Sequence, residues 1–229
     1  MSHANSPALG GEINSTPAPP APTPLTSPVP APLSPTSLIR RLTSATERLD
    51  FAGLFPVAQP LEIELGSGDG SFLAAYAKQN PTRNFVGVER LLGRIRKLDR
   101  KGQRAGLTNL RLLSIEAGYF LKYLVPAGSV HALHIYFPDP WPKRKHWKHR
   151  LINEAFPALA RSVLVPAGIA YLRTDHTDYF LQMQRVFAAA SGFQSVATPE
   201  ELSGVVTDFE RNFNARGIAT LSAAYQRVG

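Results

Sequence analysis

The sequence predicts an α/β fold, in which a mostly parallel sheet carries helices on both faces. From residue 61 onward, short β-rich runs alternate with longer amphipathic runs, and most of the short runs end in Gly or an acidic residue. Because these short runs are almost continuously apolar, we expect strands that are buried on both faces and connected by helices.

The expected elements follow in order along the chain. The strands are residues 61–65, 84–89, 109–114, 130–137 and 168–175, and the helices are 71–79, 91–106, 116–124, 149–164 and 177–191. Leu91, Ile95 and Leu98 supply the buried stripe of the second helix. Short β-like pieces and a final run, 219–228, complete the chain. We expect the fourth strand to adjoin the first, which opens a crevice between them.

Residues 1–36 differ in composition from the rest. They contain ten of the 20 prolines, many alternating with Ala, Ser and Thr, and a single charge, Glu12. Such a stretch cannot bury a core, so we expect a disordered Pro/Ala-rich tail followed by one domain at 37–229. A Pro-rich peptide ligand for a partner is the minor alternative.

Composition excludes several classes of protein. The absence of cysteine excludes disulfides, thiolate zinc sites and the Cys nucleophile that methylation at pyrimidine C5 normally needs. No apolar run reaches the roughly 18 residues of a membrane span, and the first residues lack a secretory signal. We therefore expect a cytoplasmic protein. A net charge of +8 suits a polyanionic partner.

A glycine-rich turn follows the first strand, in the sequence ELGSGDG at 64–70. Glycines there let the backbone approach a ligand closely. The dinucleotide fingerprint G-x-G-x-x-G would need Gly where Ser71 stands, and the phosphate-binding loop G-x-x-x-x-G-K-[ST] is absent. A nucleoside without phosphates therefore fits better than a nicotinamide cofactor or ATP.

Acidic residues accompany three consecutive strands. Glu64 ends the first, Glu89 ends the second, and Glu116 follows the third. An acid after the second strand can accept hydrogen bonds from ribose hydroxyls, and Glu116 is placed to take the adenine edge. Helix capping explains any one such acid, but three together indicate an S-adenosyl-L-methionine site.

The segment FPDPWPKRKHWKHR, 137–150, follows the fourth strand. Its three prolines stiffen the backbone around Asp139 and Trp141. Five basic residues interleaved with aromatic rings come next, a pattern that favours RNA contact when it lies beside an active site. Only one proline precedes Trp141, unlike the Asp/Asn-Pro-Pro-aromatic motif of exocyclic amine methylation, so we expect another target atom.

With these motifs and the Thr-Asp pair at 174–175, residues 60–229 closely resemble the bacterial tRNA (guanine-N7)-methyltransferases. The resemblance implies a Rossmann-like class I methyltransferase fold, with S-adenosyl-L-methionine as cofactor and tRNA as substrate. It implies methyl transfer to N7 of guanine 46 in the variable loop, forming 7-methylguanosine. We expect no metal, no membrane and no obligate protein partner, in a monomer or homodimer.

The resemblance also implies roles for individual residues. The cofactor-binding positions are Glu64, Gly66, Gly68, Gly70, Glu89, Glu116 and Asp139, and Asp139 is also the catalytic position. The substrate-binding positions are Lys143, Asp175, Thr207, Asp208, Phe209 and Glu210. The RNA-contacting stretch is Lys145, His146, Trp147, Lys148, His149 and Arg150. Glu116 stands where the family usually has Asp or Asn, and 211–228 match the family more loosely.

Guanine N7 carries a lone pair and no proton, so its methylation needs no general base. The protein has to hold N7 in line with the methyl carbon, at roughly 3 to 3.5 Å. We hypothesise that Asp139 and Asp175 accept hydrogen bonds from guanine N1 and N2 or from the cofactor's amino group. Helix capping is the alternative, especially for Asp175.

Two further questions stay open in the sequence. A second basic cluster, on the helix after Glu89, either contacts tRNA or is a solvated face; it comprises Arg90, Arg94, Arg96, Lys97, Arg100, Lys101 and Arg104. A protein or small-molecule substrate, and a non-catalytic RNA-binding module, remain the rival functions. The basic segment beside the site argues against the first, and the three acids argue against the second.

Overall fold

Seven strands form one sheet in the order β3-β2-β1-β4-β5-β7-β6. Their bounds are β1 Leu61–Leu65, β2 Asn84–Glu89, β3 Leu110–Ser114, β4 Val130–Tyr136, β5 Leu164–Thr174, β6 Phe193–Val196 and β7 Leu221–Arg227. Strands β1 to β5 are parallel to one another, and β7 runs antiparallel to both β5 and β6. The predicted mostly parallel sheet is confirmed, with β4 beside β1 where the strand order reverses.

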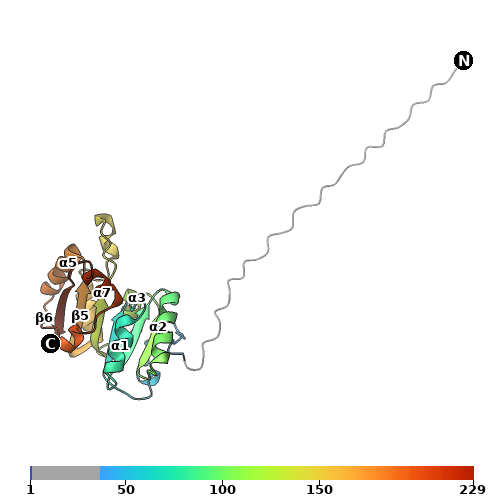
Figure 1. Ribbon diagram of the computed structural model, residues 1–229, viewed down its shortest axis with the longest axis horizontal. Coiled ribbons are helices and arrows are strands. Elements are labelled where there is room, and N and C mark those ends of the chain that lie inside the picture. Colours follow the sequence, from blue (N-terminus) through green and yellow to red (C-terminus); the bar gives the residue numbers. More distant parts are fainter. Residues whose placement is uncertain (2–36) are drawn as a thin grey trace. The chain divides into compact units, whose positions relative to one another are not determined.

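The helices lie on both faces of this sheet (Figure 1). They are η1 Ala52–Leu54, α1 Ser71–Gln79, α2 Leu92–Arg104, α3 Ala117–Tyr119, the π-helical η2 Phe120–Leu124, η3 Arg144–His149, α4 Phe156–Val163, α5 Thr177–Ala188, α6 Glu200–Ser203 and α7 Asp208–Asn214. One apolar cluster packs side chains of α1 and α2 against the sheet, and another packs η2, α4 and α5 against it. The predicted two-sided covering is therefore confirmed.

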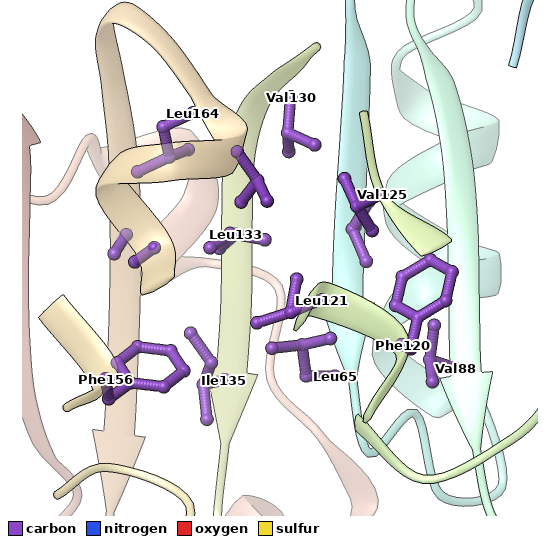
Figure 2. Packing of buried hydrophobic residues seen from close by; sticks show 14 of the residues in the cluster. Leu65, Val88, Phe120, Leu121, Val125, Val130, Leu133, Ile135, Phe156 and Leu164 are labelled. Atoms are coloured by element: carbon purple, nitrogen blue, oxygen red, sulfur yellow. The ribbon is translucent and has the colours of Figure 1, made fainter. Parts of the chain in front are cut away.

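Alternating side chains of one strand enter these two clusters. Leu133 and Ile135 of β4 join the cluster beneath η2 and α4, where Figure 2 shows them near Leu121 and Phe156. His134, between them in sequence, points to the other face. The period of two in a strand thus builds both layers from one segment.

The structure is a computed structural model that describes Met1 and residues 37–229. Apart from Met1, the predicted tail at 1–36 lies outside the described residues. The described residues from 37 onward belong to one compact unit. In that part of the chain, no helix is both long and apolar enough to cross a membrane.

The helix predicted at 149–164 is wrong in its first half. The helix α4 begins only at Phe156, and the short 3-10 helix η3 ends at His149. Pro157 lies in the first turn of α4, where its missing N–H and fixed φ are tolerated, whereas a helix starting at 149 would place it in the interior. Asn153 accepts the backbone N–H of Ala155 instead.

Leu91 also differs from its prediction. Ile95 and Leu98 are fully buried, but Leu91 is 47% exposed. It precedes α2 with an extended backbone, so its side chain does not follow the helical stripe.

Candidate active site

A cleft of about 470 Å³ opens where β1, β2, β3 and β4 end. It is lined by residues that follow each of these strands, among them Gly66, Glu89, Glu116 and Asp139. Four residues predicted to bind the cofactor, which are far apart in the sequence, thus share one cleft. A second hollow of about 310 Å³, between α4 and α5, contains none of the predicted site residues.

The glycine turn has the backbone geometry that the sequence predicts. Gly66, Gly68 and Gly70 all have positive φ, between 55° and 80°, which only glycine adopts without strain. A Cβ on Gly70 would lie 2.1 Å from Cδ1 of Leu98. The turn is therefore pressed against α2, and its first glycine faces the cleft.

Glu89 joins this turn to the end of β2. Its Oε2 accepts the backbone N–H of Gly68 at 3.1 Å, and its Oε1 accepts that of Leu91 at 2.8 Å. Glu116 also lines the cleft and is the N-cap of α3, where it accepts the N–H groups of Gly118 and Tyr119 at 2.8 and 2.6 Å. Both carboxylates are held in place by backbone donors.

Glu64 does not line the cleft. Its side chain is buried on the α1 face of the sheet, beneath the glycine turn, and its Oε2 has no hydrogen-bond partner. Burial raises the pKa of Glu64 to about 8, although Ser67 and Arg173 oppose the shift. The site therefore contains a buried carboxyl group that lacks one polar partner.

The loop after β4 forms the wall that carries Asp139. Phe137 and Trp141 both adopt positive φ, 50° and 44°, which is strained for bulky residues. Asp139 lies between them, exposed and lining the cleft. Trp141 and His149 line it as well, with their ring centroids 5.2 Å apart.

Arg150 holds this strained loop. The residue is only 1% exposed, and its Nε donates to the carbonyl of Pro140 at 2.6 Å. Nη1 donates to Gln182 at 2.7 Å, and the guanidinium lies over the rings of Trp147 and Tyr179. The prediction that Arg150 contacts RNA is therefore corrected, because burial takes its charge away from any phosphate outside.

The rest of the predicted RNA-contacting stretch is more accessible. Lys145, Lys148 and His149 are exposed, and His146 and Trp147 are partly buried. In Figure 1 this yellow segment projects from the body of the domain. Their contact with RNA stays a prediction.

The predicted substrate-binding residues lie outside the cleft. Lys143 is exposed, and Asp175 follows β5. His176, not Asp175, caps α5 by accepting the N–H of Tyr179, so capping does not explain Asp175. Helix α7 approaches the cleft through Phe213, whose ring lies 5.9 Å from that of Phe137.

The segment from Thr207 to Glu210 forms the start of α7. Thr207 and Glu210 make a reciprocal capping box, and Glu210 is buried. The N–H of Asp208 donates to Ser71 Oγ at 2.9 Å, which ties α7 to the start of α1. Phe209 is 51% exposed.

Sequence reasoning missed the supporting role of Arg173. This residue of β5 is 3% exposed and pairs with Glu210. A lone arginine inside the apolar strand YLRTD was the available signal. Arg90, Leu91 and Tyr136 were likewise not predicted to line the cleft, although they do.

The strand order, the glycine turn and the acid-lined cleft define a class I methyltransferase. The sequence matches the model of the methyltransferase family Methyltransf_4 over residues 58–223. The chain belongs to the family of bacterial tRNA (guanine-N7)-methyltransferases. It is therefore an enzyme.

Two relatives carry the family name. The tRNA (guanine-N(7)-)-methyltransferase of Geobacter metallireducens is 35% identical over 184 residues, which is 78% of this chain and 87% of the relative. That of Hydrogenovibrio crunogenus is 33% identical over 192 residues, 82% of this chain and 80% of the relative. Among solved structures, the 16S rRNA methyltransferase KamB superposes with a TM-score of 0.54 at 19% identity, covering 75% of this chain and 89% of KamB. This last similarity supports the fold alone.

Proposed function

We propose that this enzyme transfers a methyl group from S-adenosyl-L-methionine to N7 of guanine 46 in the tRNA variable loop, forming 7-methylguanosine. The observation that carries the proposal is the convergence of Glu89, Glu116 and Asp139 on one cleft, whose wall continues into the basic segment after β4. The names of the relatives support the target atom and the tRNA substrate. We place the reaction in the cytoplasm, where tRNA is found.

The residues present fit the proposed cofactor. S-adenosyl-L-methionine is cationic at its sulfonium and amino groups, and its ribose and adenine carry hydrogen-bond donors. The cleft carries the carboxylates of Glu89, Glu116 and Asp139, and the buried carboxyl group of Glu64 has one oxygen without a partner. When bound, the cofactor supplies the methyl group from its sulfonium.

The protein's part in the reaction is placement. Guanine N7 brings its own lone pair, so no side chain has to remove a proton. The loop around Asp139, anchored by the hydrogen bond from Arg150 to Pro140, provides a wall against which the base can lie. Holding N7 in line with the methyl carbon accounts for the rate without acid–base catalysis. We expect Asp139 and Asp175 to accept hydrogen bonds from the N1 and N2 donors of guanine, which adenine does not present in that arrangement, or from the amino group of the cofactor.

The decisive experiment is methylation of unmodified tRNA transcript with labelled S-adenosyl-L-methionine, followed by nucleoside analysis. The expected product is 7-methylguanosine, and replacing guanine 46 by adenine should abolish the label. Recovery of a different methylated nucleoside would overturn the proposal.

The role of Asp139 is tested separately. Asp139→Asn is expected to lower kcat by about 100-fold, because the negative charge is lost and one acceptor oxygen at the reacting base becomes an NH2 donor. Glu154→Gln, at an exposed position that does not line the cleft, is the matched control and should leave kcat unchanged. Near-normal turnover of Asp139→Asn would remove Asp139 from the reaction.

A further inference from the structure

The outer face of α2 carries charge of one sign. By the outer face of α2 we mean the side chains of Arg94, Arg96, Lys97, Arg100, Lys101 and Arg104, each of which is exposed or partly exposed. The single acid of the helix, Asp99, points inward, where it accepts Ser37 Oγ at 3.1 Å and the N–H of Leu38 at 2.7 Å. No acid of α2 therefore neutralises its outer face.

Two of these cations have partners elsewhere. Lys101 lies 2.9 Å from Asp69 and 3.9 Å from Asp208, and Arg94 lies 3.8 Å from Glu89. Within the described part of the chain, the side chains of the other four make no hydrogen bond or ion pair; they are Arg96, Lys97, Arg100 and Arg104. These four are the cations that a partner could engage without breaking an existing contact.

The arrangement is unfavourable for the helix itself. Arg96, Arg100 and Arg104 follow one another at intervals of four, so like charges are neighbours on the helix surface and repel. A solvated face with no other role would be more stable with mixed charges. A polyanion bound along this face would remove the repulsion.

The position of α2 beside the cleft indicates that the polyanion bound along its outer face is the substrate of the enzyme. Arg90, Leu91 and Arg94 line the cleft, so α2 starts at the wall formed after β2. Its axis then leads away from the cleft for about 15 Å between residues 94 and 104, and residues four apart are about 6 Å apart along it. The basic segment Arg144–His149 begins at the wall after β4. Cations therefore flank the cleft on both its β2 side and its β4 side.

We propose that the outer face of α2 is a second RNA-docking surface, which holds the tRNA backbone through phosphate contacts on the β2 side of the cleft. The inference rests on the proposed function, because it takes tRNA as the substrate. The face suits phosphates and not a lipid bilayer, because from Gly93 to Arg104 its exposed positions offer no large apolar side chain to insert.

The test compares two double variants that each remove two positive charges. Arg96→Gln/Arg100→Gln alters the outer face of α2. The matched control, Lys78→Gln/Arg185→Gln, alters exposed positions on α1 and α5 that do not line the cleft. For each full-length protein, the Kd for tRNA is measured at several salt concentrations, together with the Kd for S-adenosyl-L-methionine and the Tm.

The α2 variant is expected to bind tRNA about tenfold more weakly, with a salt slope reduced by about 1 to 2. The control should match the wild type, and both should keep the wild-type cofactor affinity. The Tm of the α2 variant should be no lower than that of the wild type, because like-charge repulsion is relieved. Arg96→Lys/Arg100→Lys, which keeps both charges, should retain most of the affinity.

Several outcomes would overturn the inference. If the wild type methylates tRNA and the α2 variant binds it as the control does, the docking surface is wrong and the proposed function stands. An equal loss in the Lys variant would show that charge is not the cause. If the wild type binds phosphatidylglycerol vesicles and the α2 variant does not, while the variant still binds tRNA as the wild type does, the face belongs to a membrane contact. A wild type that does not methylate tRNA would remove the proposed function and this inference together.

Discussion

Arg173 of β5 and Glu210 of α7 form a buried ion pair, with Nη1 and Oε2 3.0 Å apart and the side chains 4% and 8% exposed. Arg173 also donates to the carbonyl oxygens of Val205 and Leu202, at 2.9 and 2.5 Å. One guanidinium thus fastens the segment before α7 to the sheet. Since α7 in turn contacts Ser71 and Phe137, this pair fixes the carboxyl-terminal wall beside the cleft.

Arg173→Met should therefore destabilise the fold strongly. Removing one partner leaves the other charge buried and uncompensated, which costs about 3 to 5 kcal/mol. The double variant Arg173→Met/Glu210→Leu should lose less than the sum of the two single variants, because no lone charge remains. Denaturant unfolding of the four proteins checks this, and strictly additive losses would show that the pair is not coupled.

Glu64 should make the cofactor-free enzyme less stable at alkaline pH. Burial raises its pKa to about 8 from an ordinary 4.5. A carboxyl group whose pKa is raised by folding stabilises the fold at low pH, and that stabilisation is lost as pH rises from 4.5 toward 8.

Glu64→Gln removes the titrating carboxyl group, so the Tm of this variant should vary less between pH 4.5 and 8 than the Tm of the wild type. At pH 8 its Tm without cofactor should exceed that of the wild type by at least about 2 °C. Thermal scans at several pH values provide the check, with the exposed Glu47→Gln as control. Parallel pH profiles for Glu64→Gln and the wild type would contradict the assignment.

Arg150 should affect turnover more than RNA affinity. In Arg150→Lys the shorter, non-planar head group cannot donate to both Pro140 and Gln182, so the loop that carries Asp139 loses its anchor. A displacement of the loop should lower kcat by at least about tenfold.

The matched variant Lys148→Gln removes an exposed cation of the same segment. It should raise the KM for tRNA in a salt-dependent way and leave kcat unchanged. Steady-state kinetics at two salt concentrations separate the two effects. An Arg150→Lys enzyme with normal kcat would show that the loop holds its shape without this anchor.

Gly70→Ala should be more destabilising than Gly106→Ala. Both glycines have positive φ, 74° and 65°, so each substitution introduces strain of about 1 to 2 kcal/mol. Only at Gly70 would the new methyl group collide with Leu98, which adds about 1 to 3 kcal/mol, whereas the space at Gly106 is open. Urea denaturation measures the difference, and equal losses would mean that α2 shifts freely away from the turn.

Local patterns in the sequence predicted most of the fold. The first two strands and α1 have the predicted bounds, because period and turn residues depend on neighbours in the chain. The predicted start of a helix at residue 149 is wrong because contacts with distant segments, and not neighbours in the chain, decide the structure there. There the apolar spacing continues through residues that the fold uses otherwise, since Arg150 turns inward to hold Pro140.

Some features of the candidate site could likewise be predicted from local sequence, and others could not. The glycine turn and the acids at strand ends could be placed on one edge of a parallel sheet from sequence, because parallel strands end at the same edge. The burial of Glu64 and the pairing of Arg173 with Glu210 could not, since each depends on segments distant in the chain.

What the sequence alone establishes is the class of fold, the family and the edge of the sheet where chemistry takes place. The three-dimensional structure shows which charged side chains are still available to a partner. Arg150 is buried, whereas Arg96 and Arg100 make no ion pair within the described residues. The physical reason is that the type of a residue sets what it can bind. Whether the side chain is free to bind a partner depends on its burial and on its contacts within the protein, and both result from packing between segments that are distant in the chain.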